Sequence, residues 1–369
     1  MNTRTDEVSK LYQRYEGPGG THLALQWKGR TRFTVPIETD GQRACWSVFH
    51  PGRLGIPLRA MARLPRLFNA QRCVEGAEIR SIRQAVGCEL ELSCCRAGAA
   101  GPWRKDTLLL LGAKTAEPLY FVKNGTGAAV DALLANEAKW LRRLRDEPDL
   151  GGYIPELVAH RTGKDFCFVA QRPLAGDLDF RLAEPQMDFL RKLQRCSRKT
   201  ILFEDSRLFM TLASRLAGLS GRLSNAWAKR LETCMIAIER SLSGQPIVLV
   251  AAHWDFTPWN IRVENQTARV FDWEFADDEQ LPLIDPLHFV LMPLALRGKP
   301  VGELISTIHK TLKLSIEIFD KELCYAASTQ ALAYLMSVCT LYLWSVQGTY
   351  SSDAVLDKYA LVLDRMCRG

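Results

Sequence analysis

The motif His253-Trp-Asp-Phe-Thr-Pro-Trp-Asn260, followed by Val270-Phe-Asp-Trp-Glu274, decides how this sequence is interpreted. The short apolar run directly before the first motif is typical of a strand that is buried on both faces. Two carboxylates, Asp255 and Asp272, and the amide of Asn260 therefore follow two neighbouring β-segments. Their oxygens suit a hard divalent cation such as Mg²⁺. We expect these three side chains to form one functional site, because polar groups beside a buried strand are costly without a role.

Composition places the chain among ordinary globular proteins that are long enough for more than one lobe. Its 369 residues are 47% hydrophobic, and 48 Lys and Arg against 41 Asp and Glu give a net charge of +7. This modest excess, without a long basic run, suits anionic ligands and predicts no nucleic-acid binding. The 11 cysteines include no CxxC pair and no zinc-type Cys/His spacing. The odd cysteine count and the polar first residues favour a reducing, cytoplasmic location.

Two stretches bear on contact with membranes. Residues 323–352 contain no charged side chain, but their Ser, Thr and Gln residues favour a buried core helix over a membrane span. Residues 56–68 place apolar side chains and three arginines at helical spacing, although Pro65 interrupts the pattern. A surface helix with a solvated arginine face is the favoured interpretation of this segment. The alternative is a weak peripheral contact with a membrane surface or with an anionic substrate.

The pattern of hydrophobic residues predicts an α+β fold in three parts. Residues 1–88 form an N-terminal extension with strands at 23–27, 32–37 and 44–49, followed by the basic segment. Residues 89–172 form a small antiparallel lobe, with strands at 89–96, 106–111, 119–123, 157–160 and 166–171 and a helix at 128–145. Residues 173–369 form a large, mainly helical lobe, with helices around 185–199, 206–223 and 226–242 and further helices after the two motifs.

The spacing of the two motifs resembles that of the kinase-like phosphotransferases. The resemblance lies in His-x-Asp, with an Asn five residues after that Asp and a second Asp twelve residues after the Asn. Asp-Trp-Glu in place of Asp-Phe-Gly is most similar to the aminoglycoside phosphotransferase and choline kinase group. The resemblance covers about residues 89–300 and implies a bilobal protein-kinase-like fold. It also implies transfer of the γ-phosphoryl group of ATP, or GTP, to a hydroxyl of a small molecule or sugar, with Mg²⁺.

The resemblance implies a role for each residue of the two motifs. Asp255 would either accept or orient the proton of the acceptor hydroxyl, and His253 would orient the loop that carries Asp255. Asn260 and Asp272 would hold Mg²⁺. Trp254 departs from the pattern, since the antibiotic kinases usually carry glycine at this position.

Nucleotide contacts are implied upstream of the motifs. Lys123, at the end of a predicted strand, would bind the α and β phosphates, and Glu137 on the next helix would hold that lysine. The remaining implied contacts are Gly98 and Gly101 in a loop over the phosphates, and Val169 and Gln171 in a hinge that receives the adenine.

Other residues favour structural interpretations. Asp285 is interpreted as a helix cap, Asp277 and Asp278 as a solvated acidic turn, and Trp227 and Trp344 as core. Two further hypotheses for the whole chain stay open. One is a kinase-like scaffold or regulator that binds nucleotide without catalysis, and the other is an enzyme that residues 56–68 deliver to a membrane-associated or glycan acceptor.

Overall fold

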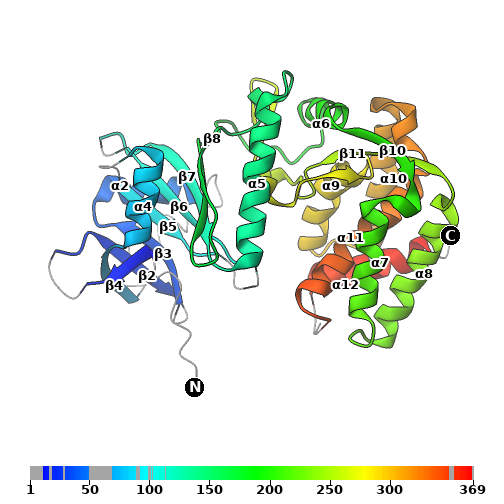
Figure 1. Cartoon of the computed structure of the whole chain (residues 1–369), viewed down its shortest axis with the longest axis horizontal. Helices are drawn as coiled ribbons and strands as arrows, with labels where there is room; N and C mark the ends of the chain where they lie inside the picture. Colours follow the sequence, from blue (N-terminus) through cyan, green and yellow to red (C-terminus); the bar gives the residue numbers. More distant parts are fainter. Residues whose placement is uncertain are drawn as a thin grey trace. The chain divides into compact units, whose positions relative to one another are not determined.

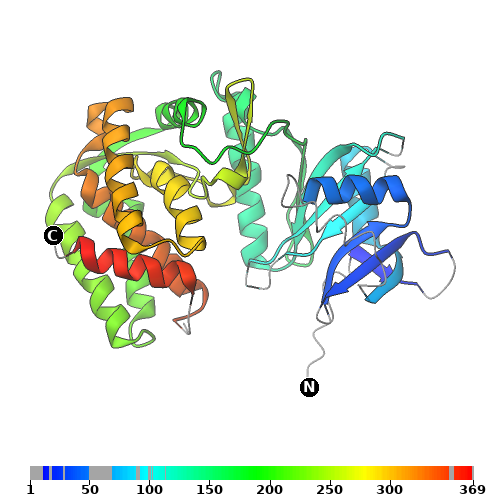
Figure 2. The ribbon, with the colours of Figure 1, turned by 180° about the vertical axis from the view of Figure 1, so that it is seen from behind.

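The computed structural model describes residues 11–15, 19–27, 30–49, 69–88, 92–98, 101, 103–112, 114–348 and 353–367. It divides into two compact units, each considered by itself (Figures 1 and 2). Unit 1 comprises Met1–Arg142 and Pro155–Leu174. Unit 2 comprises Arg143–Ile154 and Ala175–Gly369. The basic segment at 56–68 lies outside the described residues.

Unit 1 is built on one antiparallel sheet, whose described strands lie in the order β1-β4-β2-β3-β5-β6-β7-β9-β8. Its strands are β1 (Tyr12–Arg14), β2 (His22–Trp27), β3 (Arg30–Pro36), β4 (Asn69–Glu75), β5 (Leu92–Arg96), β6 (Asp106–Leu111), β7 (Pro118–Gly125), β8 (Leu157–Arg161) and β9 (Cys167–Gln171). The first four strands continue the sheet of the others, because β3 pairs with β5. The N-terminal residues thus share a sheet with the strands expected to form a small lobe.

Alternation along the strands gives this sheet two buried faces. Leu108 and Leu110 of β6 pack in a cluster with α4 (Ala77–Val86), whereas Leu109 and Leu111 pack in a second cluster with α2 (Thr39–Phe49). Figure 1 shows α4 in front of the sheet, and Figure 2, from behind, shows α2 in front. Both faces of the sheet are therefore covered, which explains the continuous leucine run of β6.

Helix α2 corrects the prediction of a strand at residues 44–49. Its buried residues Cys45, Trp46 and Phe49 recur at helical spacing and face β5 and β6. A disulfide joins Cys45 to Cys94 of β5 within this core. Neither the helix nor the disulfide was expected from a sequence interpreted as that of a reducing compartment.

Unit 2 is mainly helical. Its helices are α6 (Glu184–Cys196), α7 (Arg207–Leu219), α8 (Asn225–Leu242), α9 (Ile284–Leu296), α10 (Val301–Ile318), α11 (Ala327–Ser345) and α12 (Ala354–Met366), and the last turn of α5 (Ala128–Asp146) also belongs here. Helix α11 packs against α7, α8, α9 and α12, so most of its residues are buried. It is the core helix expected from the uncharged stretch. None of the helices in the described part of the chain combines the length and apolar character needed to cross a bilayer.

Two small β-structures carry the functional segments of unit 2. A three-stranded sheet has the order β10-β11-β14, from β10 (Arg198–Leu202), β11 (Pro246–Ala252) and β14 (Asp277–Gln280), and β12 (Ile261–Glu264) pairs with β13 (Thr267–Val270) as a hairpin. Strand β10 begins where the predicted helix at 185–199 was expected to continue. The prediction of a solvated acidic turn was also wrong, because Asp277 and Asp278 are half-buried in β14. Trp227 is buried as predicted, whereas Trp344 is exposed.

Candidate active site

The loop of residues 253–260, which we call the motif loop, follows β11 and is held by a buried aspartate. Asp285 accepts hydrogen bonds from the backbone N–H groups of His253 (2.8 Å) and Trp254 (2.9 Å). Burial raises the pKa of this carboxyl, while His253 and the two N–H groups oppose that rise. Trp254 has a φ of 71°, in the left-handed region that favours glycine. Asp285 therefore holds a strained turn of the motif loop and does not cap its own helix.

Replacing this carboxylate should destabilise unit 2. In an Asp285→Ala variant, two backbone N–H groups lose their acceptor in a site where Asp285 is only 2% exposed. At roughly 1–3 kcal/mol for each unsatisfied buried group, we expect the free energy of unfolding to fall by about 2–6 kcal/mol. Urea unfolding followed by tryptophan fluorescence measures this. Asp205→Ala, at an exposed aspartate, is the matched control, and an equal loss in both variants would contradict the assigned role.

Both carboxylate oxygens of Asp255 have a partner. Oδ2 accepts a hydrogen bond from Nδ2 of Asn260 at 2.8 Å, and Oδ1 lies 3.2 Å from Nε2 of His288 on α9. The Asp255 side chain stays 32% exposed, so the fixed carboxylate is still accessible. This combination of a fixed orientation and an open face is what a general base needs.

The contact with His288 was not predicted from the sequence. His288 is buried, and its Nδ1 lies 3.2 Å from the hydroxyl of Tyr334, which in turn lies 3.1 Å from the hydroxyl of Tyr359. Burial raises the pKa of both tyrosines, so their hydroxyls stay protonated. The sequence does contain one signal for this contact. His288 follows Asp285 by three residues, so both side chains lie on the same face of one helix.

His253 lies beneath the motif loop and orients it. Its Nδ1 accepts from the backbone N–H of Asp255 (3.3 Å), so Nε2 carries the proton and donates to the carbonyl of Phe271 (3.0 Å). Burial lowers the pKa of this imidazole, although the nearby carboxylates, Asp285 foremost, oppose the shift. His253 therefore links the motif loop to the end of β13 as a neutral ring.

Asn260 and Asp272 leave the β12–β13 hairpin at the same end. The register pairs Ile261 with Val270, and the backbone N–H of Phe271 donates to the carbonyl of Asn260 at 3.1 Å. Asn260 uses its Nδ2 on Asp255, so Oδ1 is the oxygen that it can offer to a cation. Asp272 has a φ of 75°, a conformation that Asp and Asn tolerate better than other side chains. Such hard oxygen ligands fit Mg²⁺.

In unit 1, Lys123 and Glu137 form the expected ion pair. Nζ of Lys123 lies 2.7 and 2.8 Å from the two carboxylate oxygens of Glu137 on α5. Glu137 is fully buried and the Lys123 side chain is 14% exposed. A buried carboxylate this close fixes the lysine as a charged ammonium group, because an unpaired charge there would be strongly unfavourable.

The other implied nucleotide contacts differ in their surroundings. Gly98 donates its N–H to Oδ1 of Asp106 at 2.9 Å, and a Cβ on Gly98 would lie 1.9 Å from the carbonyl oxygen of Lys105, so this position requires glycine. A Cβ on Gly101 would meet nothing within 4 Å. Val169 pairs with strands on both sides, which engages its backbone in the sheet. Gln171, at the end of β9, has a buried Oε1 without a hydrogen-bond partner among the described residues.

Comparison with known proteins extends these observations. Residues 99–279 match the model of the phosphotransferase enzyme family, and no curated protein matches the chain. Among solved structures, the apo form of a thermostable mutant of aminoglycoside phosphotransferase APH(4)-Ia is similar with a TM-score of 0.50 and 13% identity, over 78% of this chain and 98% of that chain. ADP-bound aminoglycoside phosphotransferase APH(2'')-Ib is similar with a TM-score of 0.48 and 16% identity, over 79% of this chain and 98% of that chain. A choline/ethanolamine kinase family protein from Mesorhizobium loti is similar with a TM-score of 0.45 and 15% identity, over 70% of this chain and 84% of that chain.

The fold and the site together define a kinase-type phosphotransferase, an enzyme that moves a phosphoryl group to a hydroxyl group. Residues 99–279, which match the model of the phosphotransferase enzyme family, carry Lys123, the motif loop and Asp272. The likeness to APH(4)-Ia confirms the predicted bilobal kinase-like fold class.

Proposed function

We propose that this chain transfers the γ-phosphoryl group of ATP or GTP to a hydroxyl of a small molecule or sugar. The observation that carries the proposal is the Asp255 carboxylate, which is accessible and has each oxygen fixed by a different side chain. Aminoglycoside phosphotransferases with bound nucleotide are among the similar structures, which supports a nucleotide as the donor. We propose ATP as the first donor to test and GTP as the second.

The proposed roles follow from the contacts of each side chain. Asp255 accepts a hydrogen bond from the acceptor hydroxyl and takes its proton as the oxygen attacks phosphorus. His288 and Asn260 keep the carboxylate oriented during this step. In unit 1, the Lys123 ammonium group binds phosphate oxygens of the nucleotide.

Asn260 and Asp272 are the residues that we propose to hold Mg²⁺. The donor set fits the cation, because an amide oxygen and a carboxylate leave the hairpin at one end. The ion would neutralise charge on the phosphate oxygens. The register of the hairpin and the left-handed backbone of Asp272 fix the positions of these two residues.

Nucleotide binding is the first part of the proposal to test. A ligand that binds only the folded state stabilises it by about 2.7 kcal/mol at a hundredfold excess over its Kd. Thermal melting of the full chain with ATP or GTP, with and without Mg²⁺, should show a rise in Tm that requires Mg²⁺. The Lys123→Met variant should need a higher nucleotide concentration for the same rise, whereas Lys313→Met, at an exposed lysine of α10, should behave as wild type.

Turnover is tested next by ADP release over a panel of hydroxyl compounds. Release that depends on both the acceptor and Asp255 supports phosphoryl transfer. A chain that binds nucleotide but transfers to no acceptor would favour the scaffold hypothesis. A chain whose Tm responds to no nucleotide would contradict the proposal at its first step.

A further inference from the structure

A small cavity lies within unit 2 beside the motif loop. Its volume is about 160 Å³, and its walls come from α7, β14, α11 and the motif loop itself. The walls include Arg215, Trp254, Asp277, Gln280 and Ser337. Ligand pockets for whole drug-sized molecules are about 300–1,000 Å³, so this cavity has room for one small group of a larger ligand.

Two residues of the cavity wall each carry a buried polar atom that has no hydrogen-bond partner among the described residues. These atoms are Oε1 of Gln280 and Oγ of Ser337, and the residues are 7% and 1% exposed. Leaving such an atom unpaired is unfavourable, because it loses its hydrogen bonds to water and gains none in the protein, and native structures contain few such atoms. An unpaired hydroxyl and an unpaired amide oxygen, carried by two residues of one cavity wall, indicate a polar ligand.

A third polar residue of the cavity wall, Arg215, carries a guanidinium group. No hydrogen bond or ion pair to Arg215 is found within the described part of the chain, and its side chain is half-buried. Burial lowers the pKa of this guanidinium, and no carboxylate opposes the shift. Arginine stays charged in proteins, so this residue of the cavity wall carries a partly desolvated cation that has no counter-ion among the described residues.

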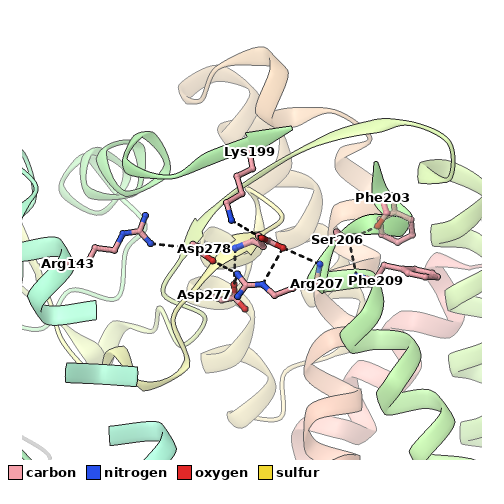
Figure 3. A network of polar contacts seen from close by, with 9 residues as sticks. Arg143, Lys199, Phe203, Ser206, Arg207, Phe209, Asp277 and Asp278 are labelled. Atoms are coloured by element: carbon pink, nitrogen blue, oxygen red, sulfur yellow. Dashed lines mark hydrogen bonds and ion pairs between the residues drawn. The ribbon is translucent and has the colours of Figure 1, made fainter. Parts of the chain in front are cut away.

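The nearest acidic residues do not provide that counter-ion. Asp277 lines the cavity, but its Oδ1 accepts from Arg207 at 2.9 Å and from the backbone N–H of Glu279. Asp278 pairs with Arg207 and Arg143. Figure 3 shows this network, in which Arg143, Lys199 and Arg207 surround the acidic strand β14. The acids of β14 are therefore neutralised by other bases, and Arg215 remains uncompensated.

The cavity shares one wall residue with the motif loop. Trp254 forms part of its wall and immediately precedes Asp255. On α11, burial raises the pKa of Tyr342, and the charges of Asp353 and Asp255 add to that rise. Tyr342 follows Leu341, another residue of the cavity wall. The charge of Asp255 therefore affects the pKa of a residue on the turn of α11 that lines the cavity. A ligand held in the cavity can thus present a hydroxyl to the motif loop.

We propose that this cavity binds the anionic group of the acceptor, so that the substrate is a hydroxyl compound bearing a carboxylate, phosphate or sulfate. The inference rests on the proposed phosphotransferase function and names its substrate class. Arg215 donates to two oxygens of the oxyanion, in the paired geometry that guanidinium groups favour. Ser337 donates to another oxygen, and Oε1 of Gln280 accepts from a hydroxyl of the same ligand.

The binding experiment uses inorganic phosphate and sulfate as probes of the full-length chain, with tryptophan fluorescence as the signal. Removing one partner of a buried charged pair costs about 2–5 kcal/mol, and 1.4 kcal/mol is tenfold in affinity. Arg215→Met should therefore weaken phosphate binding by at least about 30-fold. Arg215→Lys, which keeps the charge and loses the paired geometry, should lie between Arg215→Met and wild type.

Two control variants separate this cavity from other phosphate sites. Arg240→Met removes the same charge from an exposed position of α8 and should bind phosphate as wild type does. Lys123→Met alters the proposed nucleotide site and should also leave this phosphate affinity unchanged. Equal phosphate affinity in Arg215→Met, Arg215→Lys and wild type would overturn the proposal, and so would a loss in Lys123→Met with none in Arg215→Met.

The transfer experiment compares acceptors that share a three-carbon skeleton. Glycerate carries a carboxylate, glycerol phosphate a phosphate ester, glycerol no charge, and serinol a cation. In wild type, kcat/KM should be at least about 30-fold higher for an anionic acceptor than for glycerol, and Arg215→Met should remove this preference. The better of the two anions identifies the acceptor chemistry. Equal or faster transfer to glycerol or serinol would overturn the proposal.

The two proposals fail in distinguishable ways. If nucleotide raises the Tm but phosphate and sulfate do not bind, the anion site is wrong and the proposed function stands. If phosphate binds through Arg215 but no nucleotide binds, the anion site stands and the proposed function is wrong.

Discussion

An Asp255→Asn variant is expected to transfer phosphoryl groups about 10³-fold more slowly than wild type, with an unchanged nucleotide affinity. General-base catalysis contributes about 10²–10⁴-fold, and asparagine cannot take a proton from the acceptor hydroxyl. The substitution keeps the size of the side chain, and its Oδ1 can still accept from Asn260 or His288. The expected loss is therefore in kcat, since the contact serves the transition state.

Steady-state ADP release gives kcat, and Tm in the presence of nucleotide and Mg²⁺ gives binding. Asp205→Asn, which removes the same charge from an exposed position, is the control and should match wild type in both. Transfer at the wild-type rate by a folded Asp255→Asn variant would remove Asp255 from the mechanism.

The elements of unit 2 with a clear apolar sequence pattern were predictable, and those without such a pattern were not. Residues 226–242 were expected as a helix and form α8 (Asn225–Leu242), and residues 246–252 form the expected strand β11. Strand β14 was missed because four consecutive acidic and amide side chains lack β-forming residues. Its stability comes from pairing with β11 and from Arg207, which lies on a distant helix. No local sequence pattern contains that contact.

In unit 1, the wrong prediction of a strand at residues 44–49 also shows that a local sequence pattern does not contain the tertiary contacts. Six residues with an apolar majority fit a strand as well as a helix, because so short a window samples less than two helical turns. These residues form the helix α2 because Cys45, Trp46 and Phe49 then cover one face of the sheet, while α4 covers the other face. The sheet contacts override the local preference for strand.

In the candidate site, too, some residues were predictable from the sequence and others were not. Asp255, Asn260 and Asp272 were predictable because a motif of fixed spacing carries them. Arg215 was not, since an arginine in the leucine-rich helix α7 is expected to be solvated. Only the fold shows that Arg215 lines a cavity and that no carboxylate of the described residues pairs with it.

The second large effect is expected at Asp272. In an Asp272→Asn variant, we expect the Mg²⁺ concentration for half-maximal activity to rise by more than about 100-fold, because the loss of a residue that merely orients a metal ligand already costs about 10–100-fold. Asparagine tolerates the φ of 75° at this position as aspartate does, so the change removes the charge and keeps the backbone. Alanine would add backbone strain to the loss of the ligand.

The measurement is ADP release as a function of Mg²⁺ at fixed nucleotide, with Mg²⁺-dependent Tm as a second readout that needs no turnover. A ligand role predicts that high Mg²⁺ partly restores the activity of Asp272→Asn, since mass action offsets the weaker site. A role confined to the structure of the hairpin predicts a lower Tm without Mg²⁺ and no rescue. An unchanged Mg²⁺ dependence with normal stability would show that the cation is held elsewhere, and Glu274, buried two residues further on, would be the next residue to replace.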